Sequence, residues 1–552
     1  AVPGYSLHHR KDLDALQKEL RQYRGTSVII YQQTCAAEKR RRRKKNLIPT
    51  LSKRLFINPD VCEGCGDCGI ESNCTSLLPL DTPLGKKRTV DQSSCNQDYS
   101  CIKGFCPSFV TVEGGTPKKR GLSKEEKTQI PDLPSPGIPS LSAEPYNIFI
   151  TGIGGTGVIT VGALLGMASH LEEKSVSVLD MTGMSQKNGA VTSHIRIAKS
   201  GHKIRAQRIA TGEADLILGC DMLTAGGQDA ISKTRIGKTT AVINTHDQPT
   251  GAFAQDRDWD FPISQLTELI SDAVGEHAHF LNATQMATSL MGDSIATNLF
   301  MLGYSFQKGL IPLQEISIHT AIELNGVAVD ANKNAFRWGR FAAVDEKAVT
   351  RRASTPEAQT IQFKPSLEST IKDRAERLTQ YQNEEYAALY LDRVHSVAEL
   401  VSAKGGSKSM TLDFANNLFR LMAYKDEYEV ARLYTDPKFI DDLKATFDGE
   451  FKIRFNLAPP LISKINDKGE LVKREFGGWM RVGFKLLSKL KFLRGTSFDL
   501  FGKTEERRQE RQLILDYVST AEESIAQLSE SNTDTVHELI QLPSEVKGFG
   551  HV

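Results

Sequence analysis

The spacing of apolar residues changes along the chain and separates segments of different kinds. Between Tyr146 and about residue 345, short apolar runs such as NIFITGI, ADLILGC and TTAVIN alternate with stretches of helical periodicity. Buried strands separated by helices are typical of a doubly wound α/β sheet. The longest uncharged run, from Ile148 to Ser169, contains six glycines. It is therefore predicted as strand, turn and helix, and not as a membrane span.

Beyond about residue 355 the pattern becomes that of long amphipathic helices, as in STIKDRAERLTQYQNEEYAALYLDRVHSVAEL. This pattern predicts a mostly helical C-terminal region. Residues 479–493 read WMRVGFKLLSKLKFL, which is a basic amphipathic stripe. We expect this stripe to pack against the rest of a large protein rather than to lie on a membrane surface. No catalytic constellation is evident in this region.

The N-terminal segment is predicted as a helix over 11–24 and a short buried strand over 26–31 (TSVIIY). A basic run, Lys39 to Lys45, follows. A solvated face is the plain interpretation of this run, and an anchor for phosphates or for an acidic protein partner is the alternative. Nucleic acid is not expected, because no aromatic platform accompanies the positive charge.

Composition adds little to the choice of function class. The formal net charge is only +2, so no overall electric field favours nucleic acid as a partner. The first residues contain no apolar signal region, which favours a cytoplasmic protein with no membrane span. At 552 residues, about three to four domains are expected.

The strongest chemical signal is a block of cysteines between Val61 and Pro107. Cys62, Cys65 and Cys68 are each two residues apart, and Cys106-Pro107 follows much later. This is the ligand spacing of a 4Fe-4S cluster. Zinc is the weaker alternative because its ligands usually come as separated pairs. Disulfides are not expected, because nothing else in the chain indicates an oxidising compartment.

The sequence leaves open whether a second iron-sulfur cluster is present. Its candidate ligands are Cys74, Cys95 and Cys101, which leave one ligand position unfilled. A non-cysteine ligand, with Asp98 the nearest candidate, or a three-iron cluster would be needed. We predict one four-iron cluster on Cys62, Cys65, Cys68 and Cys106.

The segment that begins at Tyr146 also carries a glycine-rich turn. Its glycines are Gly152, Gly154, Gly155 and Gly157, and Asp180 ends the next predicted strand. This pattern fits a dinucleotide fingerprint, so a nicotinamide or flavin cofactor is one interpretation. The alternatives are a turn that only packs helix on strand, or a cradle for another anion.

A polar loop follows the strand that ends at Asp180, at the sheet edge where such folds bind ligands. Its candidate residues are Ser185, Gln186, Lys187 and Asn188. Lys187 is expected to meet a phosphate or carboxylate, unless the loop is an ordinary polar one. Cys220 is predicted to be a buried core thiol rather than a nucleophile.

Several of these stretches together resemble one known family. They are QTCAAEKRRRRKK, NPDVCEGCGDCGIESNC, CNQDYSCIKGFCPSFVTVEGG, GIGGTGV and LDMTGMSQKNGAV. In this order they resemble the C-terminal portion of the fused bacterial indolepyruvate:ferredoxin oxidoreductases, within the 2-oxoacid:ferredoxin oxidoreductase superfamily. The resemblance covers essentially the whole chain.

The resemblance implies a function as part of a larger enzyme. In that family a thiamine diphosphate module decarboxylates an arylpyruvate, coenzyme A accepts the acyl group, and iron-sulfur clusters pass electrons to ferredoxin. The domain that begins at Tyr146 is then a gamma domain rather than a nicotinamide site, and the 184–189 loop faces the active site. The chain lacks an intact thiamine diphosphate motif, since Gly292-Asp293-Ser294 does not match it. We therefore expect thiamine diphosphate and Mg on an upstream portion, with which this chain assembles.

The resulting fold prediction is an α/β multidomain protein. It has a ferredoxin-like iron-sulfur module, a doubly wound α/β gamma domain and a mostly helical C-terminal region, and a homo-oligomer is expected. The predicted segments are 1–50 (the end of a thiamine-diphosphate-binding domain with the basic segment), 51–115 (iron-sulfur module), 116–145 (linker), 146–350 (gamma domain) and 351–552 (helical domain). Two other functions stay as alternatives, an iron-sulfur NAD(P)-binding reductase and a non-catalytic electron-transfer scaffold.

Overall fold

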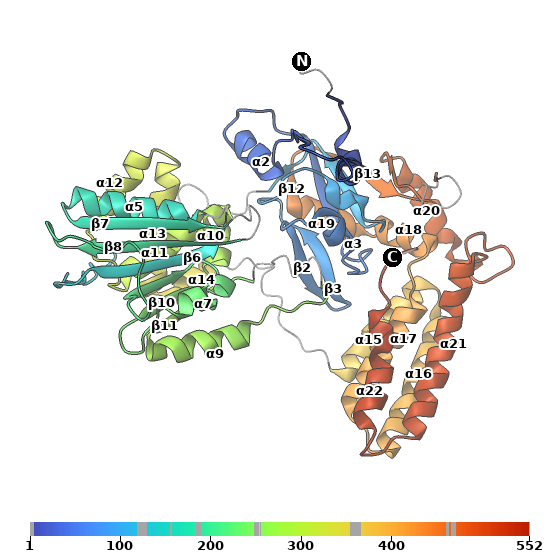
Figure 1. Ribbon diagram of the computed structural model, residues 1–552. Helices are drawn as coiled ribbons and strands as arrows, with labels where there is room; N and C mark the ends of the chain where they lie inside the picture. The colour runs from blue at the N-terminus through green and yellow to red at the C-terminus, as the bar shows by residue number, and fades with distance from the viewer. Residues whose placement is uncertain are drawn as a thin grey trace. The chain divides into compact units, whose positions relative to one another are not determined.

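The computed structural model of the chain describes residues 5–118, 130–154, 157–183, 189–247, 253, 256–353, 366–459, 463–464, 471–550 and 552 (Figure 1). The chain divides into two compact units. The first unit comprises residues 1–52 and 95–98, and the second comprises residues 53–94 and 99–552.

The described part of the first unit is helical where it is regular. It contains η1 (Arg10–Asp12), α1 (Leu13–Leu20) and α2 (Ala36–Lys44), and α2 carries most of the basic run. The buried strand predicted over 26–31 is wrong, because these residues form no strand and Val28 and Ile30 are exposed. A strand is stable only when it pairs, and the described residues of this unit offer no second strand.

A mixed sheet forms the core of the 146–353 region. The strand order is β11-β10-β9-β6-β8-β7, and β8 alone among these strands runs antiparallel to its neighbours. The bounds are β6 (Tyr146–Ile153), β7 (Ser175–Thr182), β8 (Ala190–Ala198), β9 (Leu216–Gly219), β10 (Thr240–Asn244) and β11 (Ala278–Leu281). The predicted strand, turn and helix over 148–169 is confirmed as β6 and α5 (Val158–Leu171).

Alternate residues of the central strands point to opposite sides, and apolar residues on both sides need to be covered. Helices therefore pack on both faces of this sheet. Ile148, Leu218 and Val242 pack with α5 and α11, whereas Phe149 and Ile243 pack with α6 and α9. The remaining helical bounds are α6 (Met222–Ala225), α7 (Gln228–Ile231), α9 (Ile263–Val274), η3 (Gly275–His277), α10 (Ala283–Met291), η4 (Ser294–Ala296), α11 (Thr297–Gln307), α12 (Glu315–Asn325), α13 (Val329–Val344) and α14 (Glu346–Ala353).

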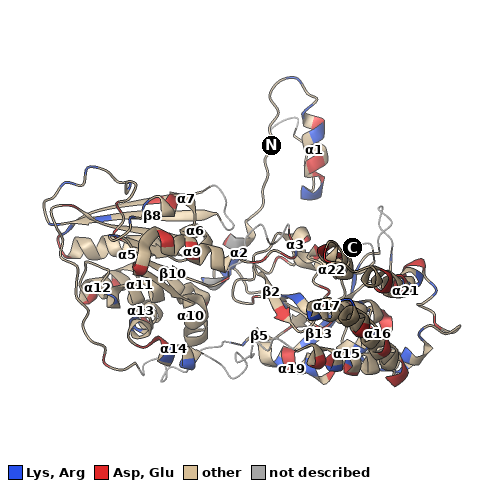
Figure 2. Cartoon of the chain, turned by 90° about the horizontal axis from the view of Figure 1, so that it is seen from below, with Lys and Arg blue, Asp and Glu red and all other residues tan. Residues whose placement is uncertain are grey.

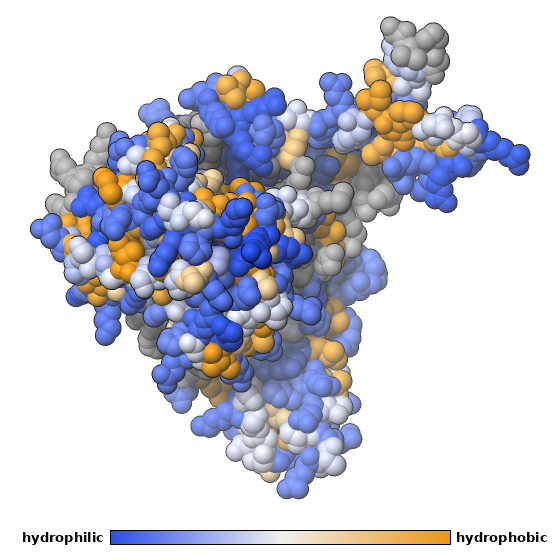
Figure 3. Space-filling view, turned by 60° about the vertical axis from the view of Figure 1, so that its left-hand side comes forward, coloured by the Kyte–Doolittle hydropathy of each residue, from blue (hydrophilic) through white to orange (hydrophobic). Residues whose placement is uncertain are grey.

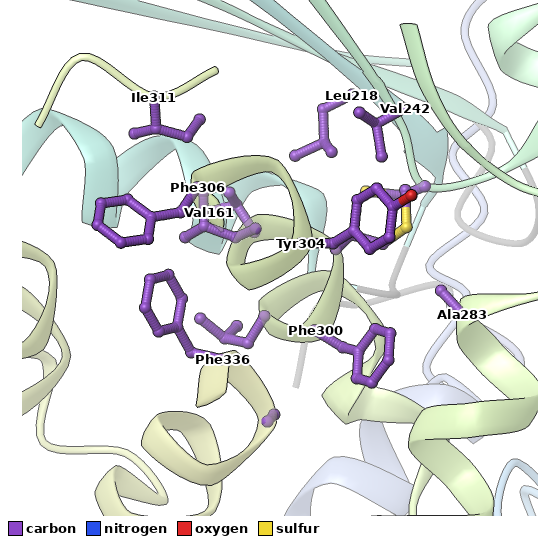
Figure 4. Packing of buried hydrophobic residues seen from close by; sticks show 14 of the residues in the cluster. Val161, Leu218, Val242, Ala283, Phe300, Tyr304, Phe306, Ile311 and Phe336 are labelled. Atoms are coloured by element: carbon purple, nitrogen blue, oxygen red, sulfur yellow. The ribbon is translucent and has the colours of Figure 1, made fainter. Parts of the chain in front are cut away.

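The larger of the two hydrophobic cores beside this sheet, on the side of α5 and α11, contains many aromatic residues (Figure 4). Phe300, Tyr304 and Phe306 of α11 are buried, as is Phe336 of α13. The two helices cross at glycines, since a Cβ on Gly303 would overlap the carbonyl oxygen of Phe336 and a Cβ on Gly339 would overlap that of Phe300. Only glycine allows this close approach of the two backbones.

The cysteine block lies in the chain between β1 and β4 of a second, smaller sheet, whose strand order is β1-β4-β13-β14. Its strands are β1 (Lys53–Ile57), β4 (Phe109–Glu113), β13 (Lys452–Leu457) and β14 (Arg474–Phe476). The C-terminal region thus completes the sheet of the cysteine module, because β13 pairs with β4 along Lys452–Phe455. The other elements of this part are α3 (Asp67–Ser72), the hairpin β2 (Leu77–Thr82) and β3 (Gly85–Val90), η2 (Ser100–Lys103), β5 (Thr116–Pro117) and β12 (Phe447–Asp448).

The helical C-terminal region is confirmed. Long helices pack around Tyr390, Phe414 and Tyr517, and both acidic and basic residues occur along them (Figure 2). The helices are α15 (Leu367–Tyr381), α16 (Glu384–Ala403), α17 (Lys408–Met422), α18 (Glu427–Thr435), α19 (Pro437–Thr446), α20 (Met480–Lys489), η6 (Leu490–Leu493), α21 (Glu505–Ala526), α22 (Thr533–Gln541) and η7 (Leu542–Glu545).

Within the described ranges, no helix is both long enough and apolar enough to cross a bilayer. Exposed apolar residues occur as small patches among polar ones on the face seen in Figure 3. The predicted basic amphipathic stripe is α20 with η6. It buries Phe484 in the core beside β13 and leaves Val482 and Leu486 exposed.

Candidate functional site

The first three cysteines lie on a tight loop that ends in α3. Gly64 and Gly66 have φ angles of +72° and +84°, a left-handed conformation that glycine adopts at little cost. A Cβ on Gly64 would also overlap the carbonyl oxygen of Lys86 on β3. The loop can therefore turn between Cys62 and Cys68 only because glycines occupy these two positions.

The segment that carries Cys106 returns against this loop. Phe105 N–H donates to Asp67 Oδ2 at 2.7 Å, and a Cβ on Gly104 would lie 3.0 Å from Cys68 Cα. Cys106 Sγ lies 2.9 Å from Ser108 Oγ. Cys62, Cys68 and Cys106 belong to one buried cluster with Leu55, Ile57 and Phe109.

The thiols of the predicted ligands affect one another electrostatically. Burial is the main factor that raises the pKa of the Cys65 thiol to about 12, and Cys106 and Cys62 raise it further. Burial is also the main factor that raises the pKa values of Cys62 and Cys68, with Cys106 the first charged neighbour in each case. Since charges shift a pKa mainly at short range, Cys62, Cys65 and Cys68 lie in the neighbourhood of Cys106.

The described residues contain no group of three or more His, Cys, Asp or Glu side chains that could hold a metal ion. A four-iron cluster needs a wider arrangement of ligands than a single metal ion, because each thiolate binds its own iron at a separate corner. Cys62, Cys68 and Cys106 in one apolar cluster, with Cys65 on the same loop, have the donor chemistry that such a cluster takes. We therefore regard the residues as fitting the group.

Two lysines from distant parts of the chain stand beside the cysteine loops. Lys473 Nζ donates to the carbonyl oxygens of Ile102, at 3.1 Å, and of Gly104. Burial lowers the pKa of Lys473, and the opposing effects of Cys106 and Asp67 are smaller. Lys425 Nζ donates to the Cys62 carbonyl oxygen at 3.3 Å and forms an ion pair with Glu63. Both cations would offset the negative charge of bound thiolates.

The remaining cysteines of the block do not share one environment. Cys101 is buried in the same apolar cluster as Cys68, and Cys74 lies at its edge. Cys95 and Asp98 belong to the first unit. The second cluster stays a prediction.

The second candidate site is the carboxyl edge of the larger sheet. β6 and β9 are neighbouring strands. From β6 the chain continues to β7, on one side of the pair, and from β9 it continues to β10, on the other side. This reversal makes the carboxyl edge between them a topological switch point. Gly154 N–H donates to the carbonyl oxygen of Gly189 at 2.8 Å, so the glycine-rich turn meets the end of the 184–189 loop. Gly155, Ser185, Gln186, Lys187 and Asn188 lie outside the described residues.

The glycine-rich turn is closely packed at its start. A Cβ on Gly152 would lie 2.8 Å from Val158 Cγ2 and 3.0 Å from Cys220 Cβ. Gly157 has φ +100° and begins α5. The first role of these glycines is therefore close packing of strand, turn and helix. Cys220 is buried, and burial raises the pKa of its thiol to about 12, as expected for a core thiol.

The position of Asp180 differs from that in a dinucleotide fold. In that fold the strand with the acidic residue lies next to the strand before the glycine turn. Here β8 lies between β6 and β7, and Asp180 lies opposite Ser193 of β8. This geometry weakens the nicotinamide interpretation.

Asp221 at the switch point was not predicted as a site residue. Its Oδ1 accepts a hydrogen bond from Thr224 N–H at 2.8 Å, and its Oδ2 is buried without a hydrogen-bond partner in the described structure. Burial raises the pKa of this carboxyl group. An acid directly after a buried strand was a signal available in the sequence. Lys473 and Lys425 had no such signal, because they lie more than 360 residues from the loops that they contact.

Comparisons with known proteins agree with this architecture. Residues 147–342 match the family Pyruvate ferredoxin/flavodoxin oxidoreductase, and residues 367–552 match a Family of unknown function (DUF6537). Indolepyruvate oxidoreductase subunit IorB of Methanothermobacter thermautotrophicus is 28% identical over 202 residues, which are 36% of this chain and 98% of the relative. The subunit of the same name from Thermococcus kodakarensis is 27% identical, over 36% of this chain and 96% of the relative.

A solved pyruvate oxidoreductase subunit from Thermotoga maritima shares 19% identity, over 36% of this chain and 96% of that chain, at a TM-score of 0.26. The matched region and its sheet define a gamma-type domain of oxidoreductase subunits. The matches over residues 147–342 support the 2-oxoacid:ferredoxin oxidoreductase superfamily for this region, in agreement with the resemblance seen in the sequence.

Proposed function

We propose that this chain is the electron-transfer and gamma-domain portion of an arylpyruvate:ferredoxin oxidoreductase, with indolepyruvate as the expected substrate type. The observation that carries the proposal is the presence, in one chain, of the gamma-type domain and of two packed cysteine segments with the ligand spacing of a cluster. The IorB relatives support the substrate type, since their printed names specify indolepyruvate. Ferredoxin is the proposed electron acceptor and coenzyme A the acyl acceptor.

The chain's own residues would hold and shield one 4Fe-4S cluster. Cys62, Cys65, Cys68 and Cys106 are the proposed ligands, and the cluster would supply one-electron transfer. Lys473 would fix the return loop through Ile102 and Gly104. Thiamine diphosphate and Mg are assigned to a partner portion, with which the chain would work in the cytoplasm. A second cluster involving Cys74, Cys95 and Cys101 is not included in the proposal.

The test begins with anaerobically purified protein, whose iron and sulfide contents and reduced EPR signal are measured. About four irons per chain are expected for one cluster. Cys106→Ser should lose most of the iron and the EPR signal, because it removes one of the ligands. Cys220→Ser is the matched control, since it removes a buried thiol outside the cysteine block and should keep both. Full iron in Cys106→Ser, or zinc in place of iron, would refute the cluster assignment.

The substrate is tested after reassembly with a thiamine-diphosphate-binding portion. Reduction of ferredoxin is followed with indolepyruvate, pyruvate or 2-oxoglutarate, in the presence of coenzyme A. We expect the highest kcat/KM with indolepyruvate. Activity with none of the three oxoacids would favour the scaffold alternative.

A further inference from the structure

A cavity of about 510 Å³ lies between the β2–β3 hairpin and the C-terminal helices, and none of its lining residues belongs to the 146–353 region. The hairpin contributes Pro83, Gly85 and Lys87 to its wall, and α15, α17 and α18 contribute most of the rest. The wall is tied together by Arg374, whose Nη2 donates to the Pro83 carbonyl oxygen. A volume of this size accommodates a small organic molecule.

Basic residues outnumber acidic ones in the cavity wall. The basic residues are Lys87, Arg374, Arg377, Arg420, Lys425 and Arg432, and the acidic residues are Asp60, Glu63, Asp413 and Glu429. Each of these four carboxylates already has a cationic or imidazole partner: Asp60 with Lys438, Glu63 with Lys425, Asp413 with His537, and Glu429 with Arg432. The acids therefore do not neutralise the remaining cations.

Two of these cations have no carboxylate within ion-pair distance among the described residues, namely Lys87 and Arg420. Lys87 is only 4% exposed, and its ammonium group makes no hydrogen bond to the described part of the chain. An unpaired buried ammonium is costly, so a group of this kind calls for an anion. Burial is the main factor that lowers the pKa of Lys87 to about 8; Lys425 and Arg420 lower it further, and Glu63 and Cys62 act in the opposite direction.

Arg420 is fixed in place but keeps charge available for a ligand. Its Nη1 donates to the Ser544 carbonyl oxygen at 2.6 Å. Its Nη2 lies 3.9 Å from the position that a Cβ on Gly85 would take, on the same hairpin that carries Lys87. A guanidinium and an ammonium thus converge on the end of the cavity formed by β3.

We propose that this cavity binds the phosphate groups of a small phosphorylated molecule. A phosphate carries about −1.5 to −2 charges at pH 7, so it neutralises both free cations, whereas a single carboxylate neutralises one. Arginine suits such oxygens because its planar fork binds two of them at once. Tyr381, Phe419 and the amides of Asn416 and Asn417 line the remaining space, where an organic part of the ligand would fit.

Calorimetric titration of the whole chain with inorganic pyrophosphate and, separately, with ADP tests the site. Lys87→Gln and Arg420→Gln should each weaken binding at least tenfold. Arg454→Gln is the matched control, because Arg454 lies on β13 and pairs with Glu113 outside the cavity. Its affinity should equal that of the wild type.

The two ligands distinguish the source of the phosphate. Tighter binding of ADP than of pyrophosphate indicates a nucleotide, and equal affinities indicate recognition of the phosphates alone; either result supports the site. Lys87 lies beside the cysteine loops, so Arg420→Gln decides the matter if Lys87→Gln does not fold. Absence of saturable binding to the wild type, or unchanged affinity in Arg420→Gln, overturns the proposal.

Discussion

The gamma-type domain and the cysteine module form their cores in opposite ways. In the gamma-type domain, strands and helices that are close in sequence pack together, and residues 146–353 supply nearly the whole core. In the cysteine module the thiols are local, but their enclosure is not. β13 pairs with β4, Lys473 bonds the return loop, and Tyr434 donates to the Pro107 carbonyl oxygen at 2.6 Å. A local motif can therefore depend on distant sequence for its stability.

The largest effect is expected at the helix crossing of the gamma-type domain. Gly303→Ala should lower the free energy of unfolding by about 3 kcal/mol or more, because the new methyl group meets backbone that cannot move aside. Urea unfolding followed by tryptophan fluorescence suits this domain, which contains Trp259 and the buried Trp338. Gly137→Ala is the control, since a Cβ there meets nothing within 4 Å. Equal stability of the two variants would contradict the close crossing.

A somewhat smaller effect is expected from pH. Burial lowers the pKa of His194 on β8 from its ordinary 6.5 to about 4. The unfolded chain therefore takes up a proton below about pH 6.5 that the folded domain does not, and stability falls as pH drops from 6.5 toward 4. The loss should reach about 2 to 3 kcal/mol in the same fluorescence assay.

His194→Asn isolates this contribution. The ring Nδ1 of His194 accepts a hydrogen bond from Ile209 N–H at 3.1 Å, which the asparagine oxygen partly replaces. The variant should be less stable at pH 7 but should lose less stability on acidification than the wild type. A pH dependence identical to that of the wild type would show that His194 is not the titrating group.

The smallest expected effect tests most directly whether the cysteine module and the gamma-type domain unfold independently. Lys473→Met removes the ammonium that bonds Ile102 and Gly104, and we expect a loss of about 2 kcal/mol in the cysteine module alone. Hydrogen–deuterium exchange should accelerate in peptides covering 101–106 and stay unchanged in those of β6 and β9. Lys452→Met is a control on the same sheet. Uniform acceleration in both regions would mean that they do not unfold independently.

Much of the gamma-type domain could be predicted from the sequence. Short apolar runs placed β6, β9 and β10 correctly, because a strand buried on both faces needs a continuous apolar stretch. The antiparallel direction of β8 could not be predicted, since apolar periodicity is the same for either direction. That direction separates Asp180 from β6 and so changes the meaning of the glycine fingerprint.

The cysteine site shows the same division. Ligand spacing predicted Cys62, Cys65, Cys68 and Cys106 as cluster ligands, which stays a prediction. The positive φ angles of Gly64 and Gly66 permit the turn between the first three. Lys87, Lys425 and Lys473 could not be identified, because their roles depend on contacts across the fold that leave no local pattern. The strand predicted over 26–31 failed for a related reason, since an apolar run does not show whether a pairing partner exists.

The pairing of β13 with β4 also has a consequence for the time course of biosynthesis. The cysteine loops emerge from the ribosome about 370 residues before Lys473, which bonds their return segment. At about 5–20 residues per second, roughly 20 to 70 seconds of translation separate the two events. During this interval the thiols are exposed to oxidants and stray metals. For the cluster proposed above, delivery of iron and sulfide to the nascent chain would therefore have to wait for, or substitute for, the C-terminal strand.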